Sequence, residues 1–266
     1  MNQSPYYQDG LFTLYHGDCL EVMERMPGAE VDLIFADPPY NLSNGGFTCH
    51  SGKRVSVNKG LWDTSRGIEN DFKFHTNWIR SCRRILSDNG SIWISGTYHS
   101  IYACGFALQK EGFQILNDIC WFKPNASPNL STRYFTASHE TLLWARKAGK
   151  GRHVFNYLDM KCGDWQDDSL KRPGKQMRTV WSIPTPRGAE KGQGSHPTQK
   201  PLALLKRIIL SSTDEGALVL DPFTGSSTTG LAACCLKRQF IGIDKEKDYL
   251  DISARRYQEM KDSGVL

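Results

Sequence analysis

Four residues at the end of an apolar run, Asp37, Pro38, Pro39 and Tyr40, could hold a planar amine. Proline nitrogens donate no hydrogen bond, so the Asp37 carboxylate and the neighbouring backbone carbonyls are acceptors that can face one spot. Two acceptors suit an NH₂ group, and the Tyr40 ring offers a face on which a flat heterocycle can stack. Taken alone, the tetrapeptide is also compatible with a turn that merely ends a strand.

A second turn, rich in Gly, Ser and Thr, follows another apolar run in VLDPFTGSSTTG (219–230). Ligands of parallel α/β sheets bind beyond the carboxyl ends of strands, where glycine lets them approach the backbone. Asp244, nineteen residues after Gly225, ends the next apolar run, a position from which a carboxylate binds ribose hydroxyls. Ser227 replaces the second glycine of the dinucleotide pattern, and Asp221 would repel a pyrophosphate. The turn therefore indicates an adenosine-containing cofactor with a cationic group, and not NAD.

Strands and helices must alternate along the chain to position these two turns. Short apolar runs predict seven strands, at 12–18, 31–37, 91–96, 114–122, 140–146, 217–221 and 240–244. Helical spacing predicts helices at 19–28, 71–86, 98–112, 201–212 and 228–237, and from about Lys245 onward. This alternation is typical of a mostly parallel sheet with helices on both faces. We expect Trp93, Trp121, Trp144 and Trp181 to lie in its core.

Two segments interrupt the alternation. Residues 41–63 form a long connection without a clear pattern, of the kind that is usually functional or mobile. Residues 147–200 are rich in Gly, Pro, Lys and Arg. From Arg146 to Lys200 there are 12 Lys and Arg against 5 Asp and Glu, a local charge of +7, which leaves −2 for the rest of a chain with net charge +5. A basic insert on a nearly neutral body favours a polyanionic partner.

Composition excludes several classes of protein. With 266 residues, 39% hydrophobic and 23% charged, the chain can bury a full core. The eight cysteines form no C-x-x-C pair, so we expect free thiols in a reducing cytosol and no metal site. The N-terminus lacks a signal-peptide pattern and no apolar stretch approaches the roughly 20 residues that a bilayer requires. We expect a cytoplasmic protein, neither exported nor bound to a membrane.

The motifs together resemble the β group of amino-directed DNA methyltransferases, in which the catalytic half precedes the cofactor half. The resemblance covers essentially the whole chain. It rests on HGDCLEVM, DPPYNLSNGG, WFKPNASPN, SHETLLWA, HPTQKPLALLKRIILSS, DPFTGSSTTG and FIGIDKEKDYL. NLSNGG and VSVNKGLWD are most similar to the GATC-type adenine enzymes of the DpnA kind, and the chain also resembles the HinfI and cell-cycle-regulated GANTC enzymes. The sequence is thus expected to adopt a permuted, Rossmann-like methyltransferase fold with a seven-stranded sheet.

This resemblance implies roles for individual residues. The target adenine, flipped out of the duplex, would be held by Asp37, Pro38, Pro39 and Tyr40. S-adenosylmethionine would be bound by Asp18, Asp221, Phe223, Gly225, Ser226, Ser227 and Asp244, together with His196, Thr198 and Lys200 of HPTQKP. The family's dimers suggest a homodimer.

The same resemblance divides the chain into three parts. Residues 1–146 would be the catalytic half with the loop 41–63, residues 147–200 a target-recognition insert, and residues 201–266 the cofactor-binding half. Candidate DNA contacts are Asn44, Lys53, Arg54, Lys59, Asn125, Asn129, Arg133, Lys171, Arg172, Lys175 and Arg178.

Several alternatives remain at this level. Cytosine N4 is a possible target, although Ser is more common than Asp at position 37 in that chemistry. Methyltransferases of the NPPY type act on protein glutamine or on RNA, but Asp37, the permuted order and the basic insert favour DNA. A non-catalytic DNA-binding protein on a methyltransferase scaffold is the third alternative, and nothing in the motifs looks disabled.

Overall fold

The computed structural model describes residues 4–40, 47–50, 53–56, 64–149, 151–186, 188–191 and 198–266. For residues 47–50 and 53–56 only the backbone is described, as a hairpin of β4 (Phe47–His50) and β5 (Lys53–Ser56). Asn44, Lys59 and His196, three of the predicted site residues, lie outside the described residues.

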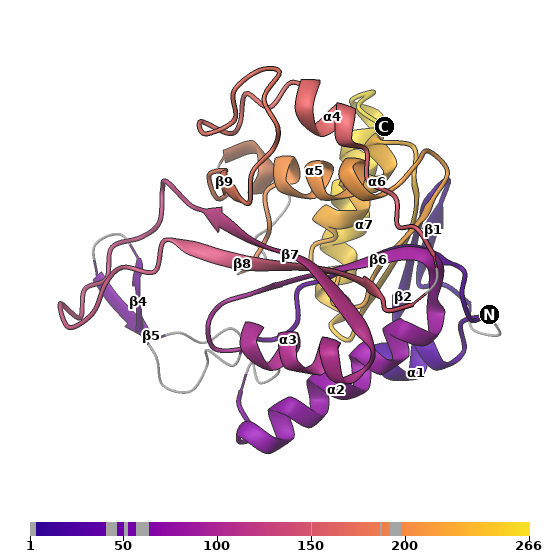
Figure 1. Cartoon of the computed structure of the whole chain (residues 1–266), viewed down its shortest axis with the longest axis horizontal. Coiled ribbons are helices and arrows are strands. Elements are labelled where there is room, and N and C mark those ends of the chain that lie inside the picture. The colour runs from indigo at the N-terminus through magenta and orange to yellow at the C-terminus, as the bar shows by residue number, and fades with distance from the viewer. Residues whose placement is uncertain are drawn as a thin grey trace.

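A mixed sheet of nine strands forms the centre of the described chain, in the order β1-β2-β11-β10-β3-β6-β8-β7-β9 (Figure 1). Its strands are β1 (Tyr7–Asp9), β2 (Phe12–His16), β3 (Val31–Ala36), β6 (Leu86–Gly96), β7 (Phe113–Phe122), β8 (His139–Lys147), β9 (Val180–Ser182), β10 (Leu218–Asp221) and β11 (Gln239–Asp244).

Helices cover both faces of this sheet, as Figure 1 shows. One face carries α1 (Cys19–Glu24), α2 (Ile68–Ile85) and α3 (Ile101–Lys110). The other carries α5 (Leu202–Ser212), α6 (Thr228–Cys235) and α7 (Lys247–Asp262). The remaining helical segments are α4 (Tyr157–Cys162) and the short 3-10 helix η2 (Gly188–Lys191).

The sheet has nine strands and not the expected seven, and part of it is antiparallel. The segment β2-β11-β10-β3-β6 is parallel throughout. In contrast, β8 runs antiparallel to both β6 and β7, because β7 and β8 are joined as a long hairpin, and β1 is antiparallel to β2. The two additional strands are β1, close to the N-terminus, and β9, which the basic insert contributes to the edge beside β7.

Strand periodicity explains how one sheet supports two cores. Along β3, Ile34 and Ala36 pack on the side of α1 to α3, whereas Leu33 and Phe35 pack on the side of α5 to α7. The four tryptophans predicted to be core residues are all buried on this second side. Trp93 and Trp144 stack with their ring centroids 5.1 Å apart.

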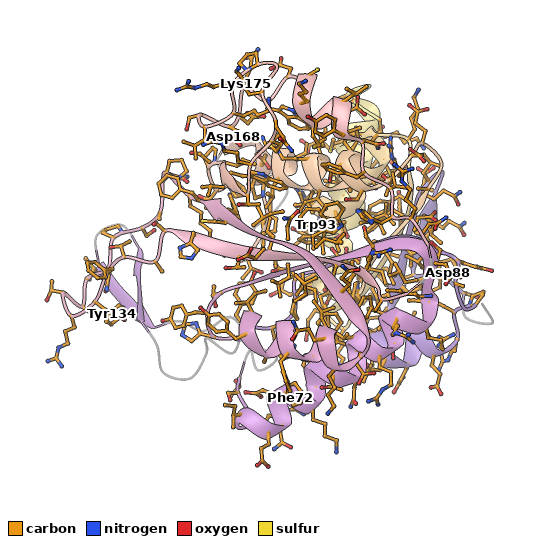
Figure 2. All side chains as sticks on the ribbon, viewed as in Figure 1. Phe72, Asp88, Trp93, Tyr134, Asp168 and Lys175 are labelled. Carbon is orange, nitrogen blue, oxygen red and sulfur yellow. The ribbon has the colours of Figure 1, made fainter. Side chains whose placement is uncertain are left out.

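The basic insert is attached to the body by a buried cation. The Arg207 guanidinium of α5 donates a hydrogen bond of 2.6 Å to Asp168 of the insert and lies over the rings of Trp165 and Trp181, 4.7 and 5.0 Å from their centroids. Asp168 also accepts from the backbone amides of Leu170 and Ser182, so its charge is fully compensated. Asp168 and Lys175 mark this part of the molecule in Figure 2.

None of the described helices is long and apolar enough to cross a bilayer. In the same described part of the chain, His, Cys, Asp and Glu side chains form no group of three that could bind a metal ion.

Candidate functional site

The two chemically suggestive turns meet at one cavity. Because β2, β11, β10 and β3 are adjacent and parallel, their carboxyl ends lie along the same edge of the sheet. A cavity of about 510 Å³ opens there, and both Asp37 after β3 and Gly225 after β10 line it. Parallel topology therefore brings together two motifs that are 184 residues apart, from Asp37 to Asp221.

Asp221 ends β10 as a buried carboxylate whose hydrogen-bond donors, among the described residues, are neutral groups. Its Oδ1 accepts from the Phe223 amide at 3.0 Å and its Oδ2 from the Thr229 hydroxyl at 2.6 Å. The pKa of Asp221 is raised to about 7, mainly by burial and to a smaller extent by the nearby carboxylates of Asp37 and Asp244, while the two hydrogen bonds work to lower it. A cationic group in the cavity would favour the ionised form.

Asp244 and Asp18 lie on the neighbouring strand ends. Asp244 accepts from the amides of Gly225 and Glu246, both at 2.8 Å, and burial raises its pKa. Asp18 caps the N-terminus of α1 through the Leu20 amide and pairs with Lys245 at 2.6 Å. Burial works to raise the pKa of Asp18, but the Lys245 ammonium and the Leu20 amide outweigh it and lower the pKa.

The turn after β10 differs from expectation at Ser227. Gly225 and Ser226 line the cavity, and Gly225 has a left-handed φ of 50°. Ser227 is not among the lining residues: it is fully buried, has a left-handed φ of 52°, and its hydroxyl pairs with that of Thr224 at 2.8 Å. Ser227 thus stabilises the turn from its buried side and does not face the cavity.

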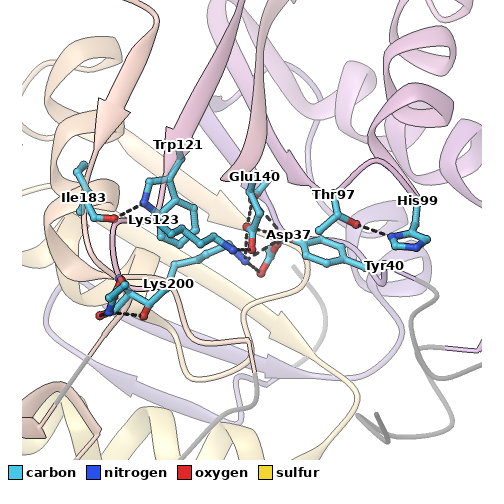
Figure 3. A network of polar contacts seen from close by, with 12 residues as sticks. Asp37, Tyr40, Thr97, His99, Trp121, Lys123, Glu140, Ile183 and Lys200 are labelled. Atoms are coloured by element: carbon cyan, nitrogen blue, oxygen red, sulfur yellow. Dashed lines mark hydrogen bonds and ion pairs between the residues drawn. The ribbon is translucent and has the colours of Figure 1, made fainter. Parts of the chain in front are cut away.

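Asp37 lies at one end of a buried row of alternating charges (Figure 3). Its Oδ2 accepts from the Lys200 ammonium, which is also 3.5 Å from Oε2 of Glu140. Oε1 of Glu140 in turn accepts from Lys123. The Tyr40 hydroxyl donates to Oδ1 of Asp37 and lies 3.1 Å from both Ser95 and Glu140. The two carboxylates and two ammonium groups compensate one another within the protein.

The pKa values in this row follow from burial and neighbouring charge. Burial and the Glu140 carboxylate raise the pKa of Asp37, and Lys200 opposes them. Burial would raise the pKa of Glu140 as well, but Lys200 and Lys123 lower it to about 2. Burial works to lower the pKa of Lys200, whereas Asp37 and Glu140 raise it, with a net increase. Lys200 is therefore a cation that favours the ionised form of both acids.

The catalytic tetrapeptide is only partly arranged as predicted. Asp37 and Pro39 line the cavity, whereas Pro38 and Tyr40 are not among its lining residues. Tyr40 is only 4% exposed, its hydroxyl is directed into the charged row, and the Lys200 ammonium lies 5.2 Å from its ring centroid. The expected stacking face of Tyr40 is covered in this arrangement, because its hydroxyl forms charge-assisted hydrogen bonds with buried carboxylates.

The HPTQKP motif also lies differently from expectation. Thr198 and Lys200 both line the cavity. Lys200, however, pairs with Asp37 and not with any residue of the turn after β10. Its place is therefore at the boundary between the two halves of the site.

Sequence reasoning missed two parts of the site. The first is a face of α2 made of Asn70, Lys73 and Asn77, which lines the cavity and whose i, i+3, i+7 spacing was a readable signal. The second is Glu140 with its partner Lys123. A lone carboxylate within the apolar run of β8 was the available sign, since a buried acid needs a cation.

Several predicted DNA contacts form hydrogen bonds within the protein. Asn125 exchanges two hydrogen bonds with Thr185, through the Thr185 hydroxyl at 2.8 Å and its amide at 2.9 Å. Asn129 binds the backbone of Tyr134 and Ser131 within its own loop. The ammonium of Lys171 donates to the carbonyls of Lys161 and Arg172.

The other predicted contacts are exposed where the structure describes them. Arg133, Arg172, Lys175 and Arg178 have exposed side chains. Lys53 and Arg54 lie in β5, of which only the backbone is described.

The cavity suits the predicted cofactor by charge and by shape. Its carboxylates are Asp18, Asp37, Asp71, Asp221, Asp244 and Glu246, and its cations are Arg66, Lys73, Lys200 and Lys245, six against four. Among the residues that the structure describes, Asp221 accepts hydrogen bonds from neutral groups, and the carboxylate of Asp244, which accepts from backbone amides, can also accept from a hydroxyl. Phe223 adds an apolar wall, packed edge-to-face on Trp78 at 5.4 Å. A sulfonium compound with an ammonium group and a ribose matches this set.

Comparison with known proteins agrees with the fold and the site. The family model described as DNA methylase, for N6 and N4 methyltransferases, matches residues 31–255. The chain is 50% identical over 255 residues to the Type II methyltransferase M2.DpnII of Streptococcus pneumoniae, covering 96% of this chain and 92% of that protein. It is 47% identical to M2.MboI of Moraxella bovis, covering 98% and 93%. The crystal structure of the M1.HpyAVI–SAM complex matches with a TM-score of 0.67 and 30% identity, covering 91% and 97%.

The chain therefore belongs to the DNA methylase family. It is a DNA methyltransferase that uses S-adenosylmethionine, and its α/β sheet is the sheet of that class of enzyme. The PvuII cytosine-N4-specific enzyme shares the fold, with a TM-score of 0.74 at 20% identity.

Proposed function

We propose that this enzyme methylates the N6 amino group of adenine in a short DNA motif, GATC, after flipping the base out of the duplex. The observation that carries the proposal is the single cavity that both Asp37 and Gly225 line. Adenine in that motif is supported by the Asp at position 37, by the resemblance of NLSNGG and VSVNKGLWD to the GATC-type enzymes, and by about 50% identity to Type II methyltransferases such as M2.DpnII.

We assign the cofactor to the ends of β2, β10 and β11. Asp221 would hold the ammonium of the methionine part, Asp244 the ribose hydroxyls, and Asp18 would lie near the adenine ring. The raised pKa of Asp221 supports this, because a bound cation replaces the compensating charge that the carboxylate lacks. When bound, S-adenosylmethionine supplies a methyl group on a positively charged sulfur.

We assign the target base to the end of β3. Each oxygen of Asp37 already accepts one hydrogen bond, from Tyr40 or from Lys200, and an incoming amino group can use a remaining lone pair or replace the Tyr40 hydroxyl. Replacing the Tyr40 hydroxyl leaves Lys200 to keep Asp37 ionised and frees the Tyr40 ring to stack on the base. Stacking on an aromatic ring contributes roughly 1–3 kcal/mol, which offsets much of the few kcal/mol that flipping costs.

Asp37 then acts mainly by positioning. Its carboxylate orients the amino group, and accepting a hydrogen bond localises the nitrogen lone pair for transfer. Holding the reacting atoms in line is the effect that can lower such a barrier most. The proton is lost readily once the nitrogen carries positive charge, so Asp37 need not be a strong base.

The remaining parts of the chain bind DNA and organise the enzyme in our proposal. Residues 1–146 form the catalytic half, 147–200 the target-recognition insert and 201–266 the cofactor half. The exposed Arg133, Arg172, Lys175 and Arg178 support phosphate contacts from the β7–β8 connection and the insert. A homodimer in the bacterial cytosol fits the family resemblance.

The test is to express the protein in a host that lacks DNA methylation and to sequence the host genome with detection of modified bases. We expect N6-methyladenine in GATC and none with Asp37→Ala. N4-methylcytosine would overturn the choice of base, adenine methylation in another motif would overturn GATC, and unmodified DNA from a folded, cofactor-binding preparation would overturn the proposal.

A further inference from the structure

The connection between β7 and β8 ends in an exposed aromatic tip, residues 130–136. Phe135 is 98% exposed and Tyr134 is 70% exposed. Figure 2 shows Tyr134 on a protrusion that extends away from the body of the molecule. Exposing a whole phenyl ring to water is unfavourable, and neighbouring exposed apolar side chains usually mark a contact surface.

The shape of this tip is held by its own hydrogen bonds. Asn129 donates to the Tyr134 carbonyl at 2.8 Å and accepts from the Ser131 amide at 2.9 Å, and its own amide donates to the Thr136 hydroxyl at 3.1 Å. Thr132 has a left-handed φ of 56°, which a β-branched residue rarely adopts. These contacts keep Phe135 pointing outward in place of folding back onto the protein.

The base of the same hairpin is joined to the catalytic residues. The Lys123 amide donates to the Ser138 carbonyl at 2.8 Å, and its ammonium binds Glu140, which contacts Tyr40. Phe135 is five residues from Glu140, so their Cα atoms are at most roughly 18 Å apart. The tip therefore lies a short distance from the proposed pocket for the base, and the hairpin sets that distance.

The charge of the hairpin suits DNA. Residues 124–138 contain no carboxylate, and their one charged side chain is that of Arg133, next to the two exposed rings. An arginine beside apolar rings can bind a phosphate while a ring enters the base stack. DNA as the partner explains why this hairpin lacks acidic residues, whereas a protein partner does not.

We infer that Phe135, supported by Tyr134, is a wedge that enters the DNA duplex beside the target and fills the space that the flipped adenine leaves. This inference rests on the proposed base flipping. It also changes the part played by Asn129, which shapes the wedge instead of reading a base.

The experiment compares kcat/KM of Phe135→Ala on two duplexes with the motif found by genomic sequencing. In one the target adenine is paired, and in the other it lies opposite an abasic site and is already unpaired. We expect Phe135→Ala to lower kcat/KM by roughly tenfold to a hundredfold on the paired duplex, which is the effect of losing one aromatic stacking contact. On the duplex with the abasic site, kcat/KM should fall by less than threefold. Phe135→Trp should recover most of the loss.

Tyr102→Ala is the matched control, because Tyr102 is 75% exposed on α3 and does not line the cavity. Tyr102→Ala should change kcat/KM by less than twofold on either duplex. Equal losses for Phe135→Ala on both duplexes, or no loss on either, would overturn the wedge. A changed oligomeric state of Phe135→Ala would also overturn it, since the tip would then be a contact between copies. A wild-type enzyme without adenine activity on either duplex would overturn the proposed function itself.

Discussion

Two neighbouring strands of this enzyme lead into the same dipeptide, Asp-Pro, and the two copies of it have different surroundings. Asp37-Pro38 follows β3 and Asp221-Pro222 ends β10, and the two strands pair in parallel through Leu33 with Val219 and Ile34 with Leu220. Both carboxylates are buried, and burial raises both pKa values. Asp37 is bound by an ammonium and a phenol, whereas Asp221 is bound by a hydroxyl and an amide.

The difference in hydrogen-bond donors indicates whether each carboxylate is suited to a neutral or a cationic ligand group. Asp37 has its compensating cation within the protein, so it can accept hydrogen bonds from a neutral amine without changing its protonation. Asp221 has neutral donors, so in our proposal a cation of the ligand compensates its charge. In our proposal the same dipeptide therefore serves a neutral substrate after β3 and a charged cofactor after β10, because different groups surround the two carboxylates.

The largest expected effect is that of Asp37→Ala. Methylation should fall by roughly a thousandfold, the upper scale for losing one preorganised polar group, while cofactor affinity changes less than threefold. Lys200 retains Glu140 as a partner, so the variant should fold. Steady-state kinetics and calorimetric titration with S-adenosylmethionine measure the two effects. A comparable loss of cofactor binding would show that the two acids do not have separate roles.

Asp221→Asn should have the complementary effect. Cofactor affinity should fall by about tenfold to a hundredfold, as expected for losing a charge-assisted contact of roughly 1.5–3 kcal/mol. In the wild type, affinity should decrease below pH 7, by up to roughly tenfold per pH unit, because Asp221 must lose a proton of pKa about 7 before it binds a cation. The variant should lack this pH dependence in the same titration.

Asp221→Asn should also stabilise the free protein at pH 8. The folded state binds the Asp221 proton more tightly than the unfolded state, so its contribution to the free energy of unfolding decreases as pH rises from 3.8 to about 7. The asparagine does not ionise, and its Tm at pH 8 should exceed that of the wild type. Equal melting curves across this pH range would contradict a raised pKa at Asp221.

Lys200→Met should shift the pH profile of methylation. Without the ammonium, the pKa of Asp37 rises further, and activity that requires the ionised acid is lost at a higher pH than in the wild type. We expect the acid limb of kcat/KM, measured from pH 5 to 9, to move up by about one unit or more. Lys200→Arg keeps the charge and should keep the limb near its wild-type position.

The smallest expected effect is at the surface of the insert. Lys175→Ala should weaken DNA binding at low salt and reduce the slope of log affinity against log salt by about 1, without changing the preferred motif. Lys110→Ala, an exposed lysine at the end of α3, is the control and should leave the slope unchanged. Fluorescence anisotropy across a salt series measures both. An unchanged slope for Lys175→Ala would remove this lysine from the DNA contacts.

Local patterns were sufficient to predict most strands and helices of the body. The helix expected over 71–86 is α2 at Ile68–Ile85, and the strand expected at 140–146 is β8 at His139–Lys147. Long-range pairing explains what was missed. The insert is expected to consist of loops and short elements, although Trp181 lies in a strand-like run. The three residues of β9 form a strand because β7 offers an edge to pair with.

The sequence by itself determined that Asp37, Asp221 and Asp244 end strands, because alternating apolar runs set strand ends and parallel crossovers place those ends on one edge. The tertiary structure alone decided which partners surround them. Lys200 reaches Asp37 across 163 residues, and Tyr40 reaches Glu140 across 100. Such pairs depend on strand order and side-chain direction, which no local pattern encodes. That is why Tyr40 was expected to face the ligand and lies instead against the buried charges.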